Sequence, residues 1–260
     1  MAISFKHLPG LVAYVTCGDP DLQTTKAVVL AAANAGADVV ELGVPFSDPV
    51  ADGPVIQAAS QRALERGTKL NDVLQLAREV RQQSDIGLIL FSYLNPIMRF
   101  GLSRFCAAAK DSGVDGALVT DLPVEEADEY VRCMRSRDLE TVFLAAPTSP
   151  DERLQRIAEL STGFVYAVSR TGVTGARKEL SDEAEALVGR IRKFTELPVA
   201  VGFGVANAEQ FTQVGAFADA AVVGSVIVRC IENAGGEHAA EAVGQFVREL
   251  RSGKSAAQRG

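Results

Sequence analysis

Short apolar runs, many of them rich in β-branched residues, recur along the chain and alternate with longer amphipathic segments. In the amphipathic segments the apolar residues fall at positions i, i+3, i+4 and i+7, the spacing that places them on one face of a helix. The apolar runs are nearly continuous, as expected of strands that are buried on both sides. The predicted strands cover residues 11–16, 38–42, 86–93, 115–120, 141–145, 163–168, 198–202 and 219–223, and helices are predicted at 24–36, 70–83, 102–113, 124–137 and 151–161.

The order of these elements predicts the fold. Eight alternations of a buried parallel strand with a helix are typical of a single-domain (β/α)8 TIM barrel, and a doubly wound open sheet is the competing fold. Gly36, Gly113 and Gly215 each end a helical segment shortly before the next strand, where glycine can supply a left-handed cap. No break in composition divides the chain. We therefore expect one catalytic domain over residues 1–251, with short extra helices, and a flexible C-terminal tail over 252–260.

Two connections are longer than the others, at residues 43–54 and 169–182. Long connections inside a compact domain are usually functional or mobile. They follow the second and the sixth predicted strands, and barrels of this kind place catalytic groups at the C-terminal ends of their strands. Both connections are therefore candidate parts of an active site.

Composition narrows the class of protein. The 260 residues are 47% hydrophobic, which is ample for a core, and 26 basic against 33 acidic residues give a net charge of -7. This charge, without a long basic run, makes nucleic acid an improbable partner. No apolar run is long enough to cross a membrane and the N-terminus lacks the pattern of a secretion signal, so we expect a soluble cytoplasmic protein. The four cysteines and two histidines are too scattered for a metal site.

The stretch VVELGVPFSDPVADG holds the first candidate catalytic groups. Side chains alternate along a strand, so Glu41 shares a face with Val39; if that face is the barrel interior, burial raises the pKa of the carboxylate toward neutrality and suits it to proton transfer. The alternative is a carboxylate bound by neighbouring backbone N–H groups. Asp48 and Asp52 follow in the long connection, and either could be a second carboxylate or a turn residue beside Pro or Gly. Spacing alone leaves that choice open.

Glycine-rich turns after the last two strands indicate a phosphate site. VAVGFGVAN contains Gly202 and Gly204, and VVGSVIV contains Gly224 and Ser225 directly before a helical run. Glycines let backbone N–H groups approach an anion closely, and a helix N-terminus adds a favourable dipole. The alternative is a pair of simple tight turns. The segment RTGVTGARKE could close over the site as a lid, or be a solvated loop.

The sequence lacks the residues that two common catalytic mechanisms require. No lysine lies inside a predicted strand, so a Schiff-base mechanism has no nucleophile. No group of His, Asp and Glu gathers at strand ends, so a metal-assisted mechanism has no ligands. Metal-free acid-base chemistry on a small phosphorylated molecule remains. Cys17, after the first strand, could be a base or nucleophile, or an ordinary small residue in a turn.

Taken together, these motifs resemble the alpha chain of tryptophan synthase. The similarity covers nearly the whole chain in order. It is carried by AYVTCGDPD (13–21), ELGVPFSDPVADGPVIQ (41–57), DLP (121–123), YAVSRTGVTG (166–175), GFGV (202–205) and VGS (223–225).

The resemblance implies a (β/α)8 barrel that cleaves indole-3-glycerol phosphate to indole and glyceraldehyde 3-phosphate in tryptophan biosynthesis. It implies that Glu41 donates and accepts protons and that Asp52 stabilises charge at the indole nitrogen, which settles the choice between the two loop aspartates. It also implies an alpha2-beta2 heterotetramer with a beta chain that holds pyridoxal phosphate, and no cofactor in this chain. The residues matched to substrate binding are Tyr14, Tyr166, Thr174, Gly175, Phe203, Gly204, Gly224 and Ser225, and those matched to the partner-facing loop are Pro45, Asp48 and Pro49.

Two departures from the family pattern are visible. Tyr14 stands where Phe is often found, which adds a hydroxyl near the indole pocket. The segment before Leu11 is short, so the helix that crosses the bottom of the barrel in the family is expected to be reduced to residues such as Phe5 and Leu8.

Three alternatives to an alpha subunit remain: a stand-alone lyase, a sugar-phosphate isomerase with Cys17 as base, and a non-catalytic activator.

Overall fold

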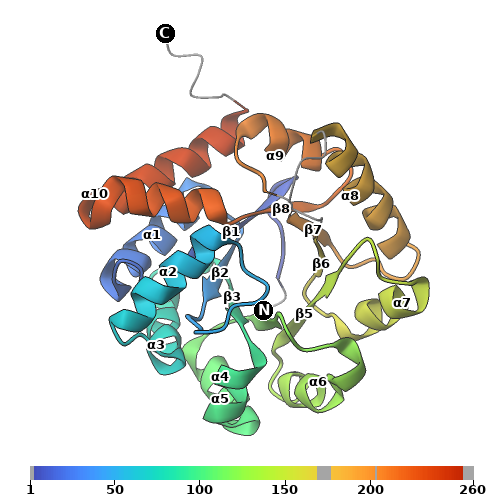
Figure 1. The fold of residues 1–260 in the computed structure, drawn as a ribbon, viewed down its shortest axis with the longest axis horizontal. Coiled ribbons are helices and arrows are strands. Elements are labelled where there is room, and N and C mark those ends of the chain that lie inside the picture. The colour runs from blue at the N-terminus through green and yellow to red at the C-terminus, as the bar shows by residue number, and fades with distance from the viewer. Residues whose placement is uncertain (1–2, 169–176, 203, 254–260) are drawn as a thin grey trace.

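Eight parallel strands close into a barrel in the computed structural model, which describes residues 3–168, 177–202 and 204–253. Each strand pairs with its neighbours in sequence, and β8 pairs with β1 (Figure 1). The predicted closed barrel is confirmed, and the doubly wound alternative is wrong. The strands are β1 (Gly10–Thr16), β2 (Val39–Gly43), β3 (Gly87–Ser92), β4 (Gly116–Val119), β5 (Glu140–Ala145), β6 (Val165–Val168), β7 (Val199–Gly202) and β8 (Ala220–Val223).

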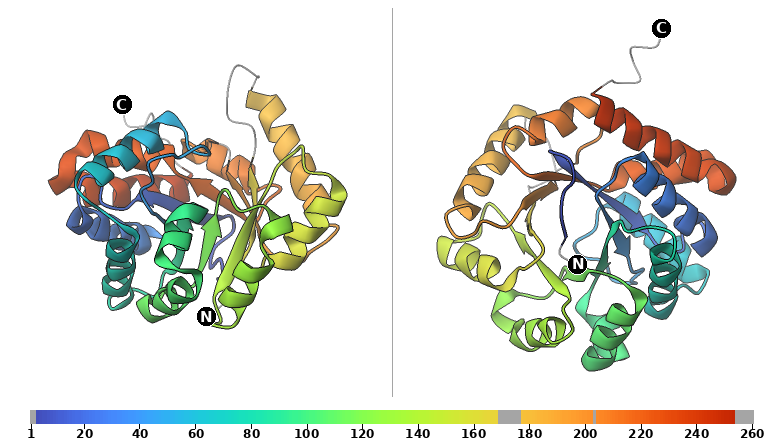
Figure 2. Two further views of the ribbon diagram at one scale, coloured as in Figure 1. Left: turned by 60° about the horizontal axis from the view of Figure 1, so that its bottom comes forward. Right: turned by 180° about the vertical axis from the view of Figure 1, so that it is seen from behind.

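Helices form a ring around the barrel, as the side and rear views show (Figure 2). Helix α1 begins where the Asp21 side chain accepts a hydrogen bond from the Thr24 N–H at 2.7 Å, a helix N-cap. The short α4 and η1 are extra to the alternating pattern, as expected. The helices are α1 (Leu22–Ala35), α2 (Pro54–Glu65), α3 (Leu70–Arg81), α4 (Leu94–Phe100), α5 (Leu102–Ser112), η1 (Val124–Glu126), α6 (Asp128–Arg135), α7 (Asp151–Leu160), α8 (Arg177–Ile191), α9 (Ala208–Val214) and α10 (Ser225–Ser252).

The strands separate two apolar cores. Alternate residues such as Val12, Val39 and Ile89 fill the barrel interior, while the residues between them pack against the helices. At the N-terminal end of the barrel, Ile3 and Phe5 join the interior core, and no helix precedes β1 among the described residues. The Phe5 ring lies 6.0 Å from that of Phe164, centroid to centroid. Phe5 therefore helps to close the barrel, whereas Leu8, 79% exposed, does not.

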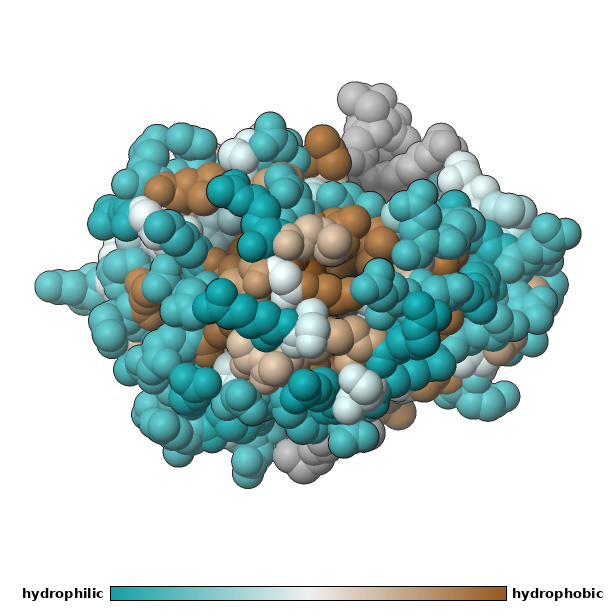
Figure 3. Space-filling model, turned by 90° about the horizontal axis from the view of Figure 1, so that it is seen from below, coloured by the Kyte–Doolittle hydropathy of each residue, from teal (hydrophilic) through white to brown (hydrophobic). Residues whose placement is uncertain are grey.

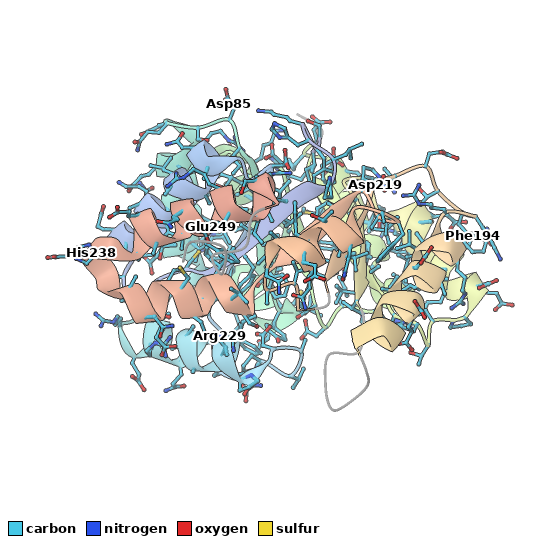
Figure 4. All side chains as sticks on the ribbon, turned by 90° about the horizontal axis from the view of Figure 1, so that it is seen from above. Asp85, Phe194, Asp219, Arg229, His238 and Glu249 are labelled. Carbon is cyan, nitrogen blue, oxygen red and sulfur yellow. The ribbon has the colours of Figure 1, made fainter. Side chains whose placement is uncertain are left out.

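Three aspartates lock strand pairs at this same end of the barrel. Asp38, Asp115 and Asp219 stand directly before β2, β4 and β8. The side chain of each accepts a hydrogen bond from a backbone N–H of the preceding strand, at 2.8 to 2.9 Å. Each also forms a salt bridge with an arginine: Arg251 of α10, Arg81 of α3 and Arg192, which directly follows α8. In Figure 4, Asp219 lies in the upper half of the view, toward the side where Asp85, shortly before β3, is labelled. These contacts fix strand register where no chemistry is expected.

The helix ends differ from one another. Gly36 and Gly113 adopt the left-handed cap conformation, with φ of 106° and 78°, as predicted, whereas Gly215 has an ordinary helical φ of -62°. Helix α10 bends at Gly235, where φ is 71°. It ends at Ser252, and residues 254–260 of the predicted tail lie outside the described residues.

Hydrophilic residues cover much of the surface, although apolar ones gather toward the centre of the side shown in Figure 3. Among the described residues, no helix combines the length and the apolar character that crossing a membrane requires.

Candidate active site

Glu41 shares the face of β2 with Val39, as the alternation of side chains predicted, and the structure shows that this face is the barrel interior. It pairs in register with Tyr14 on β1 and Ile89 on β3. The residue is fully buried, and neither carboxylate oxygen has a hydrogen-bond partner in the described structure. Binding of this carboxylate by neighbouring backbone N–H groups is therefore not observed. Burial raises the pKa of Glu41 to about 8, because a buried carboxylate loses its hydration. Glu41 is consequently protonated at neutral pH.

Asp52 stands at the end of the connection between β2 and α2, directly before the N-cap residue Gly53. Burial raises the pKa of Asp52 to about 6, against the opposing effect of a hydrogen bond with the Tyr93 side chain. The Tyr93 hydroxyl also accepts a hydrogen bond from the Ala51 N–H at 3.0 Å. One phenol thus anchors the end of this loop, and at neutral pH Asp52 is mostly ionised while Glu41 is protonated.

The other loop aspartate, Asp48, is in a different setting. It is exposed, and its carboxylate accepts a 2.6 Å hydrogen bond from the neighbouring Ser47 hydroxyl. Pro45 is buried and Pro49 half-buried, while Val50 between Pro49 and Ala51 is 84% exposed. The loop therefore directs Asp52 inward and presents Asp48 and Val50 to the outside.

Two tyrosines lie in the interior beside the carboxylates. Tyr14 and Tyr166 each lean over a glycine of the next strand: a Cβ added to Gly43 would lie 2.3 Å from the Tyr14 hydroxyl, and one added to Gly202 would lie 2.5 Å from the Tyr166 hydroxyl. Burial is the main cause of the raised pKa of both phenols, and the charges of Glu41 and Asp52 add to it. Both carboxylates and both phenols therefore lie near one another at this end of the barrel interior.

The glycine turns after β7 and β8 lie at the same end of the barrel. Gly204 has a φ of 79°, a conformation that favours glycine. Gly224 precedes Ser225, the first residue of α10, whose first turn carries no acidic residue. The free N–H groups of that turn and the helix dipole make it suitable for an anion. Thr174, Gly175 and Phe203 lie outside the described residues, as does the part of the predicted lid up to residue 176. The predicted long connection over 169–182 is too long, because residues 177–182 are helical and belong to α8.

Cys17 does not suit acid-base chemistry. It is fully buried within the core between strands and helices, and burial raises the pKa of its thiol well above its usual range. No group of three potential metal-binding side chains (His, Cys, Asp or Glu) occurs among the residues described here.

Tyr93 and Gly43 were missed as site residues from the sequence. Tyr93 ends the third predicted strand, so its place at a strand end was the available signal.

Comparison with known proteins agrees with this arrangement. The family profile described as tryptophan synthase alpha chain matches residues 3–256. The tryptophan synthase alpha chain of Solibacter usitatus is 51% identical over 244 residues, which cover 94% of this chain and 91% of that protein. In the crystal structure of the tryptophan synthase complex from Pyrococcus furiosus, one chain has a TM-score of 0.87 at 43% identity, with 94% of this chain and 98% of that chain covered. A chain of tryptophan synthase from M. tuberculosis has a TM-score of 0.86 at 31% identity, with 95% and 92% covered. The chain therefore belongs to the tryptophan synthase alpha chain family.

Proposed function

We propose that this chain cleaves indole-3-glycerol phosphate to indole and glyceraldehyde 3-phosphate, as a carbon–carbon lyase of tryptophan biosynthesis. The observation that carries the proposal is Glu41, a fully buried carboxylic acid at the mouth of the barrel with both oxygens free of hydrogen bonds among the described residues. A buried carboxyl group without hydrogen bonds lowers the stability of the fold, so its presence indicates that it acts on a ligand. Family membership gives the substrate.

The two carboxylates divide the proton transfers. Protonated Glu41 donates its proton to indole C3, which turns the ring into an indolenine cation, and ionised Asp52 stabilises the positive charge at the ring N–H. The Glu41 carboxylate then removes the proton of the glycerol hydroxyl next to the breaking bond. The electron pair of the C–C bond returns to the ring, and an aldehyde and indole leave. Glu41 ends protonated, so the cycle is balanced, and pKa values near 8 and 6 suit these roles near neutral pH.

The remaining residues bind the substrate. We assign the phosphate to the N–H groups at Gly204, which follows β7, and at Gly224 and Ser225, at the start of α10. Tyr14 and Tyr166 line the interior around the indole and glycerol. Thr174, Gly175 and Phe203 keep their proposed roles at the lid and the pocket from the family resemblance alone.

A beta chain is the proposed partner. Pro45, Asp48 and Pro49 belong to the loop assigned to that contact, and the exposed Val50 beside them offers apolar surface. One similar solved structure is described as the a2b2 complex of tryptophan synthase from Pyrococcus furiosus, 45% identical with a TM-score of 0.89. We propose the same alpha2-beta2 assembly, with pyridoxal phosphate in the beta chain, no cofactor in this one, and a cytoplasmic location.

The test is indole release from indole-3-glycerol phosphate by the wild type and by Glu41→Gln, each with and without a beta chain. The variant keeps the shape of the side chain but cannot exchange the proton. Activity that rises with the beta chain and is lost in Glu41→Gln supports the proposal. Activity indifferent to the partner favours a stand-alone lyase. An inactive wild type under all conditions refutes the lyase and leaves a non-catalytic activator.

A further inference from the structure

Gln57 joins two parts of the connection between β2 and α2. It lies in the first turn of α2, and its side-chain nitrogen donates hydrogen bonds to the Asp52 carbonyl oxygen at 2.7 Å and to the Pro49 carbonyl oxygen at 3.4 Å. Because both partners are acceptors, only the nitrogen end of the amide can face them, and its two N–H groups match the two bonds. One side chain therefore holds the backbone of Asp52 together with that of a proline assigned to the partner-facing loop.

Asp52 and Pro49 also meet through the backbone. The Asp52 N–H donates a hydrogen bond to the Pro49 carbonyl oxygen at 3.1 Å, which closes a turn over Val50 and Ala51. The Pro49 oxygen thus accepts from both Asp52 and Gln57. Within this turn Val50 is 84% exposed, so a protein that docks against the loop meets the turn directly. A shift of Pro49 therefore changes both hydrogen bonds.

Helix α2 gives the Gln57 amide a firm base. Ala59 and Ser60, just beyond Gln57, are buried, and the Ser60 hydroxyl accepts a hydrogen bond from the Phe46 N–H at 3.0 Å, near the other end of the same connection. Tyr93 acts from the β3 side, where its ring packs against Phe46 with the centroids 4.9 Å apart. The connection is thus held from β3 by an aromatic ring and from α2 by Ser60 and Gln57.

Water weakens the Gln57 hydrogen bonds in the isolated chain. Gln57 is exposed, so water competes with it for both carbonyl oxygens, and such hydrogen bonds contribute little to stability. A partner seated on the turn excludes this water, and hydrogen bonds become stronger as the local dielectric constant falls. Covering the turn should therefore fix Asp52 more firmly than the isolated chain does.

We propose that Gln57 is a positioning residue that couples a partner seated at Pro49 to the placement of Asp52 in the active site. The inference deepens the proposed function and rests on it for the identity of the partner, a beta chain, and of the reaction. Coupling of this kind works in both directions. Loss of Gln57 should therefore weaken binding of the beta chain as well as its effect on Asp52.

The test compares Gln57→Leu with the wild type in indole release, with and without a beta chain. We expect the factor by which the beta chain raises kcat to fall about fivefold to tenfold, as for the loss of one hydrogen bond. KM should change little, because the proposed phosphate site lies on other elements. Beta-chain affinity, measured by isothermal titration calorimetry, should fall. Gln57→Glu keeps the shape of the side chain without its N–H donors, and should act like Gln57→Leu.

Gln61→Leu is the matched control. Gln61 lies one turn further along the same helix, is exposed like Gln57, and donates to the Glu65 carboxylate at 2.9 Å instead of to the connection. We expect its activation by the beta chain to equal that of the wild type. An equal loss in Gln57→Leu and Gln61→Leu, or no loss in either Gln57 variant of an active enzyme, overturns the inference.

Hydrogen exchange separates this inference from the lyase proposal, because it needs no turnover. In peptides that span residues 43–56, followed by mass spectrometry, the beta chain should slow exchange in the wild type and slow it less in Gln57→Leu. Exchange that the beta chain does not slow, or slows equally in both chains, overturns the inference whatever the activity. Slowing that requires Gln57 in a chain that releases no indole refutes the proposed function and leaves the coupling standing.

Discussion

Replacing Glu41 by Gln should stabilise the fold while it removes activity. Folding moves this carboxyl group from water, where its ordinary pKa is 4.5, to a fully buried position where its pKa is about 8. Below pH 4.5 the Glu41 carboxyl group is protonated in both the folded and the unfolded chain, so the pKa shift does not change the free energy of unfolding. Between pH 4.5 and pH 8 folding takes up a proton at this group, and the cost to stability grows with pH. Above pH 8 this cost reaches its full value. At pH 7 the cost is about 3 kcal/mol, and it approaches about 5 kcal/mol at high pH.

Gln carries no proton to exchange, so the variant escapes this penalty. We expect Glu41→Gln to match the wild type in stability near pH 4.5 and to exceed it by about 3 kcal/mol at pH 7. The assay is urea unfolding followed by circular dichroism at pH 5, 7 and 9. The control is Glu241→Gln, an exposed glutamate of α10, whose effect should not grow with pH. If the stability of Glu41→Gln relative to the wild type did not increase between pH 5 and pH 9, the conclusion that Glu41 is buried without a partner would be wrong.

Three further outcomes follow from the same contacts. The profile of kcat/KM against pH should be bell-shaped, falling below about pH 6 as Asp52 takes up a proton and above about pH 8 as Glu41 loses one; a flat profile from pH 5 to 9 would contradict both assignments. Asp38→Asn should lower the free energy of unfolding by about 2 to 3 kcal/mol in urea unfolding, because the half-buried Arg251 loses its charge partner; a loss below 1 kcal/mol would show that this contact does not stabilise the fold. Gly43→Ala should abolish most indole release, since its Cβ would lie 2.3 Å from a tyrosine hydroxyl, whereas Gly53→Ala, with open space around it, is the control that should retain its activity.

The hydrophobic pattern predicted the barrel because its strands are buried on both faces and their apolar runs stand out from the polar connections. Each predicted strand end lies within two residues of the observed one. Alternation along β2 also predicted that Glu41 shares a face with Val39, but that this face is the interior required the structure. The contact of Tyr93 with the end of the β2–α2 loop could not be predicted in this way, because 42 residues separate Tyr93 from Ala51. The fit of Tyr14 over Gly43 likewise depends on the register of two strands.

The two ends of the barrel differ in the partners that they give to carboxyl groups. At the N-terminal end, Asp38, Asp115 and Asp219 each have a backbone N–H and an arginine as partners. At the C-terminal end, Glu41 has neither among the residues that the structure describes, and Asp52 has a hydrogen bond with the Tyr93 phenol. A carboxylate with hydrogen-bond and charge partners stabilises the fold, whereas a buried one without partners costs stability and has a raised pKa, as Glu41 does. Substitutions at the first end should therefore change stability without moving the pH profile of catalysis, and substitutions at the second should move that profile.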